Sequence, residues 1–368
     1  MKIDTLFIDD SLLPDDETDY LIAKINAQPQ RIDDAKIVYD FINNSDDPIS
    51  LAKKTLYITQ NKGAVIRNCP GTCHYTCCDY TILHTGTFCT MDCSYCILQA
   101  YFHPPVLQYF TGFNHLDHEL RTIFDQNKIF RIGTGEYTDS LIWEKVSLMP
   151  KFLVETFAKQ DHSVIELKTK TVNIDSLLLL DHNEKTIISW SLNTPDIIKS
   201  QEKGTASLLA RLEAARRVEL KGYRIAFHFD PIVIYPGCED DYKTVIQRIF
   251  EYVRPENIVW ISLGTFRFMP SLKQVIEKRF PESTLCYGEF ILGLDNKMRY
   301  FKPLRIHIYK EMISCIKDYG PDVFIYFCME DEEVWQKCIG FFPEKEGHLG
   351  NMLDQSAAKH CNLNTALI

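Results

Sequence analysis

The sequence CTMDCSYC at residues 89–96 places Cys89, Cys93 and Cys96 within eight residues. A loop this short can bring three thiolates to three corners of one metal cluster, and thiolate-rich sites select iron–sulfur clusters or zinc. A structural zinc site needs a fourth ligand and usually contains paired cysteine knuckles. Three cysteines leave one iron of a cubane without a protein ligand, free to bind a small molecule. The spacing therefore favours a 4Fe–4S cluster, with buried or zinc-bound thiols as the alternative.

The composition indicates the class of protein and the cellular compartment to expect. Its 368 residues are 45% hydrophobic and 24% charged, as in a globular protein with one large α/β domain. It has no run of eighteen apolar residues, and its N-terminus is acidic from Asp4, so we expect neither a membrane span nor a signal peptide. Seven of the 13 cysteines lie within residues 69–96, which indicates metal or redox chemistry in a reducing compartment. We therefore expect a cytoplasmic protein.

The formal net charge of −10 weighs against non-specific binding to nucleic acid, which depends on Lys and Arg side chains. A local basic groove remains compatible with this total. Two stretches could form one, with a solvated helix or strand face as the alternative for each: Arg211, Arg216, Arg217, Lys221 and Arg224, and Lys297, Arg299, Lys302 and Arg305.

Strand and helix patterns alternate from Tyr80 onward. Apolar runs predict strands at residues 80–84, 129–133, 163–168, 186–192, 223–229 and 258–263. Helical spacing falls between most of them, at residues 114–124, 145–157, 206–220, 241–252 and 272–280. This alternation indicates parallel β/α units, and six of them predict an α/β fold with a partial (β/α)6 TIM-like barrel. The cysteine loop would follow the first strand.

We expect three parts along the chain. Residues 1–78 form a small N-terminal α/β unit that ends in a cysteine-rich segment, residues 79–284 form the barrel, and residues 285–368 form a C-terminal extension. Within the extension, residues 300–309 read as a basic, aromatic strand or loop. Roughly the last fifteen residues are polar and are expected to fray.

Polar residues follow the predicted strands at the end that a parallel barrel gathers into one site. Glycine permits close backbone approach there, and a carboxylate can pair with an ammonium group. The strand ends carry Gly135 and Glu136, Lys168 and Lys170, Ser191 and Asn193, His228 and Asp230, and Gly264 and Thr265. We expect these groups to share a cavity.

The CxxxCxxC spacing, with Tyr95 before the last cysteine, resembles the signature of the radical SAM superfamily. In that superfamily the open iron chelates S-adenosylmethionine (SAM), and reduction cleaves SAM to a 5′-deoxyadenosyl radical. The resemblance implies that Gly135 and Glu136 receive the methionine amino group. Tyr95 would pack against adenine, or serve only to pack its own loop.

Two further strand ends gain a role from the same resemblance. Lys170, with Lys168 as its competitor, would pair with the methionine carboxylate. Ser191 and Asn193 would hydrogen-bond the carboxylate or the ribose hydroxyls.

A narrower resemblance is to the spore photoproduct lyase family. The cysteine loop continues as YCILQ at residues 95–99 and closes in the leucine–glutamine pair of that family's motif. Further matches follow in order along most of the chain: TK at 169–170, SLN at 191–193, KGT at 203–205, RLEAA at 211–215 and VIEKRFP at 275–281.

That family repairs a methylene-bridged thymine dimer in DNA: the radical abstracts hydrogen, the bridge breaks, and a cysteine returns a hydrogen atom. The resemblance implies a DNA repair lyase that binds a single strand or a flipped lesion, with a reducing partner such as flavodoxin or ferredoxin. Tyr137 stands where the donor cysteine aligns, and Ile97 replaces a tyrosine. Tyr137 could donate the hydrogen atom or only a structural hydrogen bond. The alternatives are a radical reaction on another nucleotide or a peptide, and a non-catalytic iron–sulfur scaffold.

A second group of thiols precedes the first strand. Cys69, Cys73, Cys77 and Cys78 lie close to His74. They could hold a second cluster or a zinc ion, or supply a redox-active pair near the radical site. Half-buried free thiols are the remaining alternative.

Overall fold

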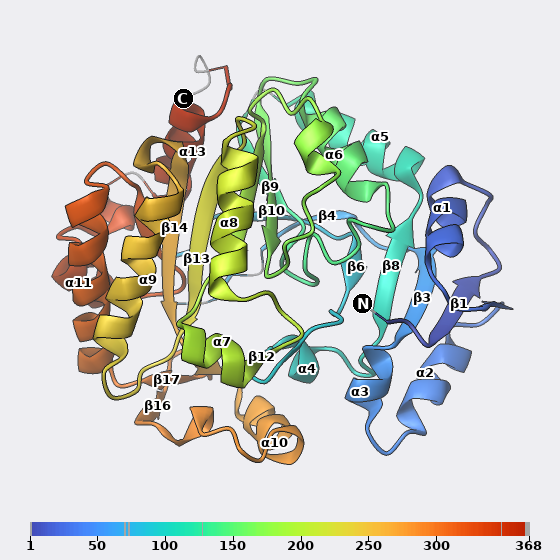
Figure 1. Ribbon diagram of the computed structural model, residues 1–368, viewed down its shortest axis with the longest axis horizontal. Helices are drawn as coiled ribbons and strands as arrows, with labels where there is room; N and C mark the ends of the chain where they lie inside the picture. Colours follow the sequence, from blue (N-terminus) through green and yellow to red (C-terminus); the bar gives the residue numbers. More distant parts are fainter. Residues whose placement is uncertain (1, 70, 73, 127, 347, 365–368) are drawn as a thin grey trace.

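A computed structural model describes residues 2–69, 71–72, 74–126, 128–346 and 348–364. Two sheets lie side by side in it, a small one built mainly from the N-terminal residues and a large curled one built from the rest (Figure 1). Cys73, one of the predicted second-site ligands, lies outside the described residues. No helix among the described residues is long and apolar enough to cross a membrane.

The large sheet has eight strands in the order β18-β14-β13-β11-β10-β9-β5-β4, and only the edge strand β4 runs antiparallel to its neighbour. All six predicted barrel strands are present, so the partial barrel is confirmed. The strand bounds are β4 (Ile66–Asn68), β5 (Thr81–Leu83), β9 (Phe130–Gly133), β10 (Ser163–Thr169), β11 (Thr186–Ser191), β13 (Arg224–Ile232), β14 (Ile258–Thr265) and β18 (Ile325–Phe327).

Helices cover the outer face of this sheet, where α8 and α9 lie next to each other (Figure 1). Each bears an apolar stripe against the strands and a start signal: the Ser207 hydroxyl caps α8 by accepting from Ala210 N, and α9 has three acidic residues in its first turn. The bounds are α5 (Phe113–Phe124), α6 (Met149–Phe157), α7 (Pro195–Gln201), α8 (Leu208–Glu219), α9 (Cys238–Tyr252) and α10 (Pro270–Arg279).

The small sheet has the order β2-β1-β3-β8-β6 and packs against three short helices. Its elements are β1 (Thr5–Asp9), α1 (Asp16–Lys24), β2 (Pro29–Ile32), α2 (Lys36–Asn43), α3 (Pro48–Ala52), β3 (Thr55–Gln60), β6 (Gly86–Thr87) and β8 (Leu107–Thr111). The predicted boundary at residue 78 is wrong for this sheet, because β6 and β8 come after it while β4 belongs to the barrel sheet.

The β3–β8 pair is parallel, so the chain between these strands has to form a long crossover, and this crossover carries the cysteine loop.

The C-terminal extension differs from the prediction in three ways. Residues 300–309 lie mostly in helix α11 (Lys302–Tyr319), because Pro303 suits a first helical turn and Arg305, Ile308 and Met312 bury one helical face. Strand β18 joins the barrel sheet, so the boundary at 284 is also crossed. Helix α13 (Leu349–His360) packs its buried Leu349, Leu353 and Ala357 on the barrel, so this part of the tail does not fray.

The remaining elements lie mainly along the strand ends. A three-stranded antiparallel sheet contains β15 (Arg267–Phe268), β17 (Met298–Tyr300) and β16 (Phe290–Leu292). Helix α12 (Glu332–Cys338) follows β18. Figure 1 shows α7, α10 and the β16–β17 hairpin together at the lower edge of the barrel.

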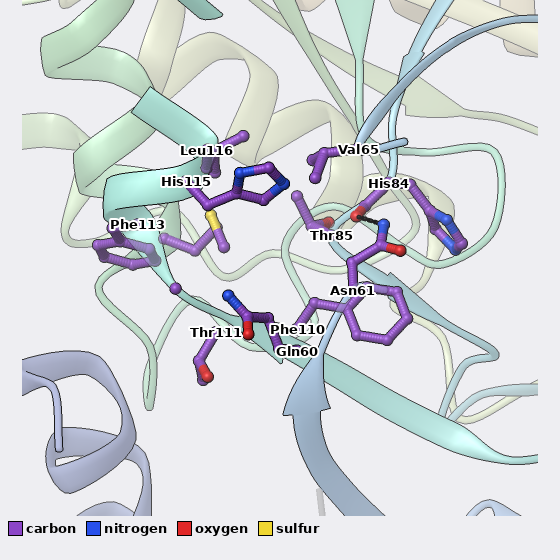
Figure 2. Close-up of a pocket in the computed structure, with 12 residues that line it drawn as sticks. Gln60, Asn61, Val65, His84, Thr85, Phe110, Thr111, Phe113, His115 and Leu116 are labelled. Atoms are coloured by element: carbon purple, nitrogen blue, oxygen red, sulfur yellow. Dashed lines mark hydrogen bonds between the residues drawn. The ribbon is translucent and has the colours of Figure 1, made fainter. Parts of the chain in front are cut away.

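The two sheets meet at a small cavity of about 20 Å³, room for a single water molecule (Figure 2). Gln60 and Phe110 line it from the small sheet, and His84 lines it from the end of β5. The Asn61 amide donates to the backbone carbonyl of His84 at 3.4 Å, the dashed line in Figure 2. The cavity is lined by none of the cysteines of residues 89–96.

The His84 side chain is 9% exposed, and neither ring nitrogen has a hydrogen-bond partner among the described residues. Burial, together with the charge of Arg67, lowers its pKa from 6.5 to about 4. The folded protein therefore keeps this ring neutral, whereas the unfolded chain protonates it below pH 6.5. Stability should fall as the pH drops from 6.5 toward 4.

The wild type should have a lower free energy of unfolding at pH 5 than at pH 7.5, and His84 should account for about 2 kcal/mol of that drop, because its ring takes up a proton only in the unfolded chain. We therefore expect the drop to be smaller by about 2 kcal/mol in His84→Leu. Urea unfolding at the two pH values measures it. The exposed His118→Asn is the matched control and should leave the difference unchanged. An equal pH dependence in wild type and His84→Leu would contradict the prediction.

Candidate functional site

The cysteine loop lies between the two sheets and is attached to the barrel by a short antiparallel ladder. Strand β7 (Asp92–Cys93) pairs with β12 (Glu202–Lys203), which follows α7. The Ser94 hydroxyl donates to the Gln201 side chain at 2.6 Å, and its amide donates to the Gln201 carbonyl at 2.8 Å. The loop is thus joined to the connection after the fourth barrel strand.

A buried lysine attaches the same loop to the small sheet. The Lys53 side chain is 7% exposed and comes from the end of α3. Its ammonium donates to the carbonyl oxygens of Cys89, at 3.2 Å, and Met91. It lies 3.6 Å from the Asp92 carboxylate and 4.5 Å from the centre of the Phe88 ring. These contacts fix the backbone on both sides of the first cysteine.

An arginine from α10 completes the support of the loop. The Arg279 guanidinium donates to the Asp92 carboxylate at 2.9 Å and to the Gln99 side-chain oxygen. The Gln99 amide in turn donates to the carbonyl oxygens of Cys93, at 2.9 Å, and Ser94, at 3.2 Å. Gln99 is the last residue of the family-like YCILQ stretch, and its role is to hold the backbone around the second cysteine.

The three cysteines are suited to hold a metal cluster. Cys93 is buried, and Cys89 and Cys96 are half-buried. Burial raises the pKa of Cys89 to about 12 and raises the pKa of Cys93, while Lys53 and Lys170 act in the opposite direction. The positive charges of Lys53 and Lys170 would therefore partly balance the negative charge of thiolates bound to a metal.

No three His, Cys, Asp or Glu side chains in the described ranges converge as they would around a single ion. Cubane ligands bind three different irons and remain farther apart than the ligands of one ion. The donor set and its spacing along the loop thus fit a cubane better than mononuclear zinc.

Tyr95 faces the barrel from the cysteine loop. Its hydroxyl donates to Glu202, which also accepts from Arg211 at 2.5 Å. Burial opposes ionisation of Glu202, yet the charges of Lys170 and Arg211 lower its pKa. The Lys170 ammonium lies 5.6 Å from the centre of the Tyr95 ring. The structure therefore places Lys170, Tyr95 and the second cysteine in one neighbourhood.

The glycine–glutamate element lies at the end of β9 beside Lys168. A Cβ on Gly135 would lie 2.8 Å from the Lys168 Cβ, so only glycine lets these segments approach so closely. Burial lowers the pKa of Lys168, but Glu136, Glu166 and Asp230 outweigh it and the pKa is raised. The lysine therefore stays charged, and Glu136 is the carboxylate that contributes most to raising its pKa.

The two predicted ligands at the end of β11, Ser191 and Asn193, differ in whether their side chains are already hydrogen-bonded. Asn193 is fully buried, and its amide donates to the Pro231 carbonyl at 2.8 Å while its oxygen accepts from Tyr242 at 2.8 Å. These bonds commit Asn193 to the fold. The Ser191 side chain is 8% exposed, and its hydroxyl has no hydrogen bond to any described residue. Of the two predicted ligands, Ser191 has the free donor.

A buried polar network fills the barrel interior behind these residues. His228 bonds to the Glu166 carboxylate and to the Ser262 hydroxyl, each at 2.6 Å. Burial opposes ionisation of Glu166, but the charge of His228 lowers its pKa to about 2. Beside this network, Arg267 bridges the Asp230 carboxylate at 3.1 Å and the Cys328 sulfur at 3.4 Å.

Sequence reasoning missed several of these residues: Lys53, Glu166, Glu202, Arg267 and Arg279. Glu166 had a usable signal, since it lies two residues before Lys168 and therefore on the same face of β10. Arg279 lies inside the VIEKRFP stretch matched to the family, but its contact with Gln99 spans 180 residues of sequence. Lys53, Glu202 and Arg267 likewise contact residues distant from them in sequence, so no local pattern identifies their roles.

Tyr137 lies in an aromatic group at the end of β9. Its ring centre is 4.8 Å from that of His84, 6.1 Å from Tyr101 and 6.2 Å from Phe102. Its carbonyl accepts from the Phe88 amide at 2.8 Å, which ties this strand end to the start of the cysteine loop. Burial raises the pKa of the Tyr137 hydroxyl, as does its hydrogen bond with Tyr101, so the phenol stays protonated at neutral pH.

In the two basic stretches considered for a local groove, three arginines are internal. Arg211, Arg299 and Arg305 are buried and pair with Glu202, Asp295 and Glu330 inside the protein. Arg216 and Arg217 lie on the exposed face of α8, the solvated-face alternative, and Lys221 is exposed just after the helix ends.

Comparison with known proteins gives several matches. Spore photoproduct lyases from Bacillus subtilis strain 168 (28% identity, 59% of this chain and 63% of the relative) and Clostridium acetobutylicum (30%, 45% and 47%) are similar to it. One from a Geobacillus species is also similar (28%, 55% and 61%). The aligned segments span less than two thirds of each of these curated relatives.

Solved structures share the fold. A spore photoproduct lyase complexed with dinucleoside spore photoproduct has a TM-score of 0.77 at 21% identity, covering 88% of this chain and 98% of that one. A mutant with bound AdoMet and the same dinucleoside has a TM-score of 0.76 over the same shares, also at 21% identity. A family model described as spore photoproduct lyase matches residues 43–310. Since that match covers well over half of the 368 residues, the chain belongs to the spore photoproduct lyase family.

Proposed function

We propose that this protein is a radical SAM lyase that repairs a pyrimidine photolesion in DNA. The observation that carries the proposal is the cysteine loop, held by Lys53, Arg279 and β12 next to the strand ends that bear Glu136 and Lys170. The curated relatives named above are spore photoproduct lyases. One of the solved spore photoproduct lyase structures contains AdoMet and dinucleoside spore photoproduct.

Cys89, Cys93 and Cys96 would hold a 4Fe–4S cluster, which when bound would supply the electron for the reductive cleavage of SAM. The chain's own residues bind and orient SAM. The Glu136 carboxylate accepts hydrogen bonds from the methionine ammonium of SAM, and the Lys170 ammonium forms an ion pair with its carboxylate.

The neighbours of these two residues set their geometry. Gly135 lets the end of β9 lie close against Lys168. The Lys170 ammonium lies 5.6 Å from the centre of the Tyr95 ring, and the Tyr95 hydroxyl donates to Glu202. Ser191 offers the free hydroxyl for the ribose or the carboxylate, a role for which Asn193 would first have to give up its internal hydrogen bonds.

We assign the return of the hydrogen atom to Tyr137. Its phenol is protonated at neutral pH and follows Glu136 directly, at the strand end where the substrate would lie. Loss of a hydrogen atom leaves a tyrosyl radical that the surrounding aromatic rings shield. The electron for each reductive step would come from a cytoplasmic carrier such as flavodoxin or ferredoxin.

The first test uses the protein reconstituted anaerobically with iron and sulfide and supplied with dithionite, SAM and an oligonucleotide bearing the methylene-bridged thymine dimer. We expect 5′-deoxyadenosine and restored thymine from the wild type. Cys93→Ala should lower the iron content and reduce both products to background, because a cluster ligand is lost. Cys286→Ser is the matched control and should keep both.

The outcomes separate the alternatives. Deoxyadenosine without thymine would retain the radical reaction and reject the lesion, leaving another nucleotide or a peptide as substrate. Bound iron with neither product would favour the non-catalytic scaffold. Unchanged turnover in Cys93→Ala would reject the assigned cluster loop.

The second test concerns Tyr137. We expect Tyr137→Phe to keep formation of 5′-deoxyadenosine but to lower restored thymine about tenfold or more, because the ring remains and only the O–H is lost. Tyr319→Phe, an exposed residue stacked on Phe250, is the control. Product analysis in deuterated water follows the transferred atom. Full thymine yield from Tyr137→Phe would leave the tyrosine a structural role only.

A further inference from the structure

Tyr101 is the exposed member of the aromatic group around Tyr137. It is the last residue of α4 (Leu98–Tyr101), which begins two residues after Cys96 and contacts α10 at the lower edge of the barrel (Figure 1). Tyr101 is 53% exposed, whereas Tyr137 is half-buried at the end of β9. The reaction described above leaves Tyr101 without a role, although its ring lies between Tyr137 and the solvent.

The rings of the two tyrosines are stacked. Their centres are 6.1 Å apart and their planes differ by 20°. Phe102 packs edge-on against both, with its ring centre 5.2 Å from that of Tyr101 and 6.2 Å from that of Tyr137. Stacked and edge-to-face pairs at these separations are the arrangements that aromatic rings favour. The packing therefore holds the two tyrosines in direct contact.

Three aromatic rings lie against Tyr137 among the described residues: His84, Tyr101 and Phe102. A tyrosyl radical at Tyr137 regains a hydrogen atom readily only from a bond that is no stronger than its own O–H bond. Phe102 has no O–H bond, and the N–H bond of the neutral His84 ring is stronger than the O–H bond of a phenol. Of these three neighbours, Tyr101 alone can return a hydrogen atom to Tyr137.

The tyrosine of the cysteine loop is not part of this group. The ring centre of Tyr95 lies 6.5 Å from that of Phe266, and its hydroxyl donates to Glu202. Tyr95 is only 8% exposed, and it is not among the rings that contact Tyr137 in the described part of the chain. The chain of contacts from Tyr137 thus leads outward to the surface.

We propose that Tyr101 carries the radical from Tyr137 to the protein surface, where an external one-electron carrier reduces it. This inference rests on the function proposed above, in which Tyr137 returns a hydrogen atom to the substrate. It adds the residue that restores Tyr137 and the fate of SAM: each repaired lesion consumes one SAM, which is not regenerated.

Each step conserves atoms and electrons. The O–H bond of Tyr137 breaks and a C–H bond forms on the thymine radical, which leaves a tyrosyl radical. The O–H bond of Tyr101 then breaks and that of Tyr137 forms again, so one hydrogen atom moves between the side chains. A carrier of the flavodoxin or ferredoxin class gives one electron to the Tyr101 radical, and water supplies the proton. Together with the electron for SAM cleavage, one repair uses two electrons, one proton and one SAM.

The first test compares the wild type with Tyr101→Phe, which keeps the stacked ring and removes only the O–H bond. Both are reconstituted anaerobically and supplied with SAM, the lesion-bearing oligonucleotide and reduced flavodoxin, a protein too large to reach Tyr137 directly. We expect equal thymine yields in the first turnover. Later turnovers of Tyr101→Phe should be slower by about tenfold or more, because the Tyr137 radical is not reduced. Tyr319→Phe, the exposed tyrosine used above, is the matched control.

Electron paramagnetic resonance of freeze-quenched samples locates the radical. Tyr101→Phe should accumulate a tyrosyl radical after one turnover, and the double variant Tyr101→Phe with Tyr137→Phe should lack it. In a protein carrying 3-aminotyrosine at position 101, whose O–H bond is weaker, the radical should collect there and give an aminotyrosyl spectrum. A purely structural role of Tyr101 would move neither signal.

Three outcomes would overturn the inference: wild-type turnover by Tyr101→Phe, restored thymine without an aminotyrosyl signal, or fewer molecules of 5′-deoxyadenosine than repaired lesions. Each leaves the first turnover of the wild type intact and rejects only the path through Tyr101. Absence of thymine from the wild type in the first turnover would instead reject the repair reaction, and the path would be rejected with it.

Discussion

The parallel pairing of β3 with β8 is the constraint on which the rest of the arrangement depends. Parallel neighbours cannot be joined by a tight turn, so the chain between them has to leave the small sheet and return. On the way it supplies β4 and β5 to the barrel sheet, and then the cysteine loop. The loop consequently belongs to both sheets, and its position is set where they meet.

Charged side chains then fix the loop in that position. Lys53 contacts it from the small sheet, Arg279 from α10, and the Glu202–Arg211 pair holds Tyr95 from the barrel. These groups are largely buried, and removing one partner of a buried pair typically costs about 3–5 kcal/mol. The network thus ties the geometry of the cysteine loop to the stability of the whole fold.

The sequence predicted much of this, for identifiable reasons. The barrel strands are short apolar runs whose burial on both faces leaves little ambiguity, and all six were confirmed. The cysteine loop stood out because three thiols are adjacent in sequence. The boundaries at 78 and 284 failed because β8 and β18 pair across them, which depends on contacts distant in sequence. Residues 300–309 were misread because their aromatic residues and charges hid a helical stripe that Arg305, Ile308 and Met312 bury.

The position of Arg279 also bears on how the protein is made. It contacts Gln99 across 180 residues of sequence, so the ribosome releases the cysteine loop long before the side chain that locks it. Helix α10, which carries Arg279, follows β14, the second-to-last strand of the barrel sheet in chain order. While the barrel strands are being synthesised, the loop therefore lacks the arginine that bonds to Asp92 and Gln99. The final geometry of the loop depends on a side chain that is made late.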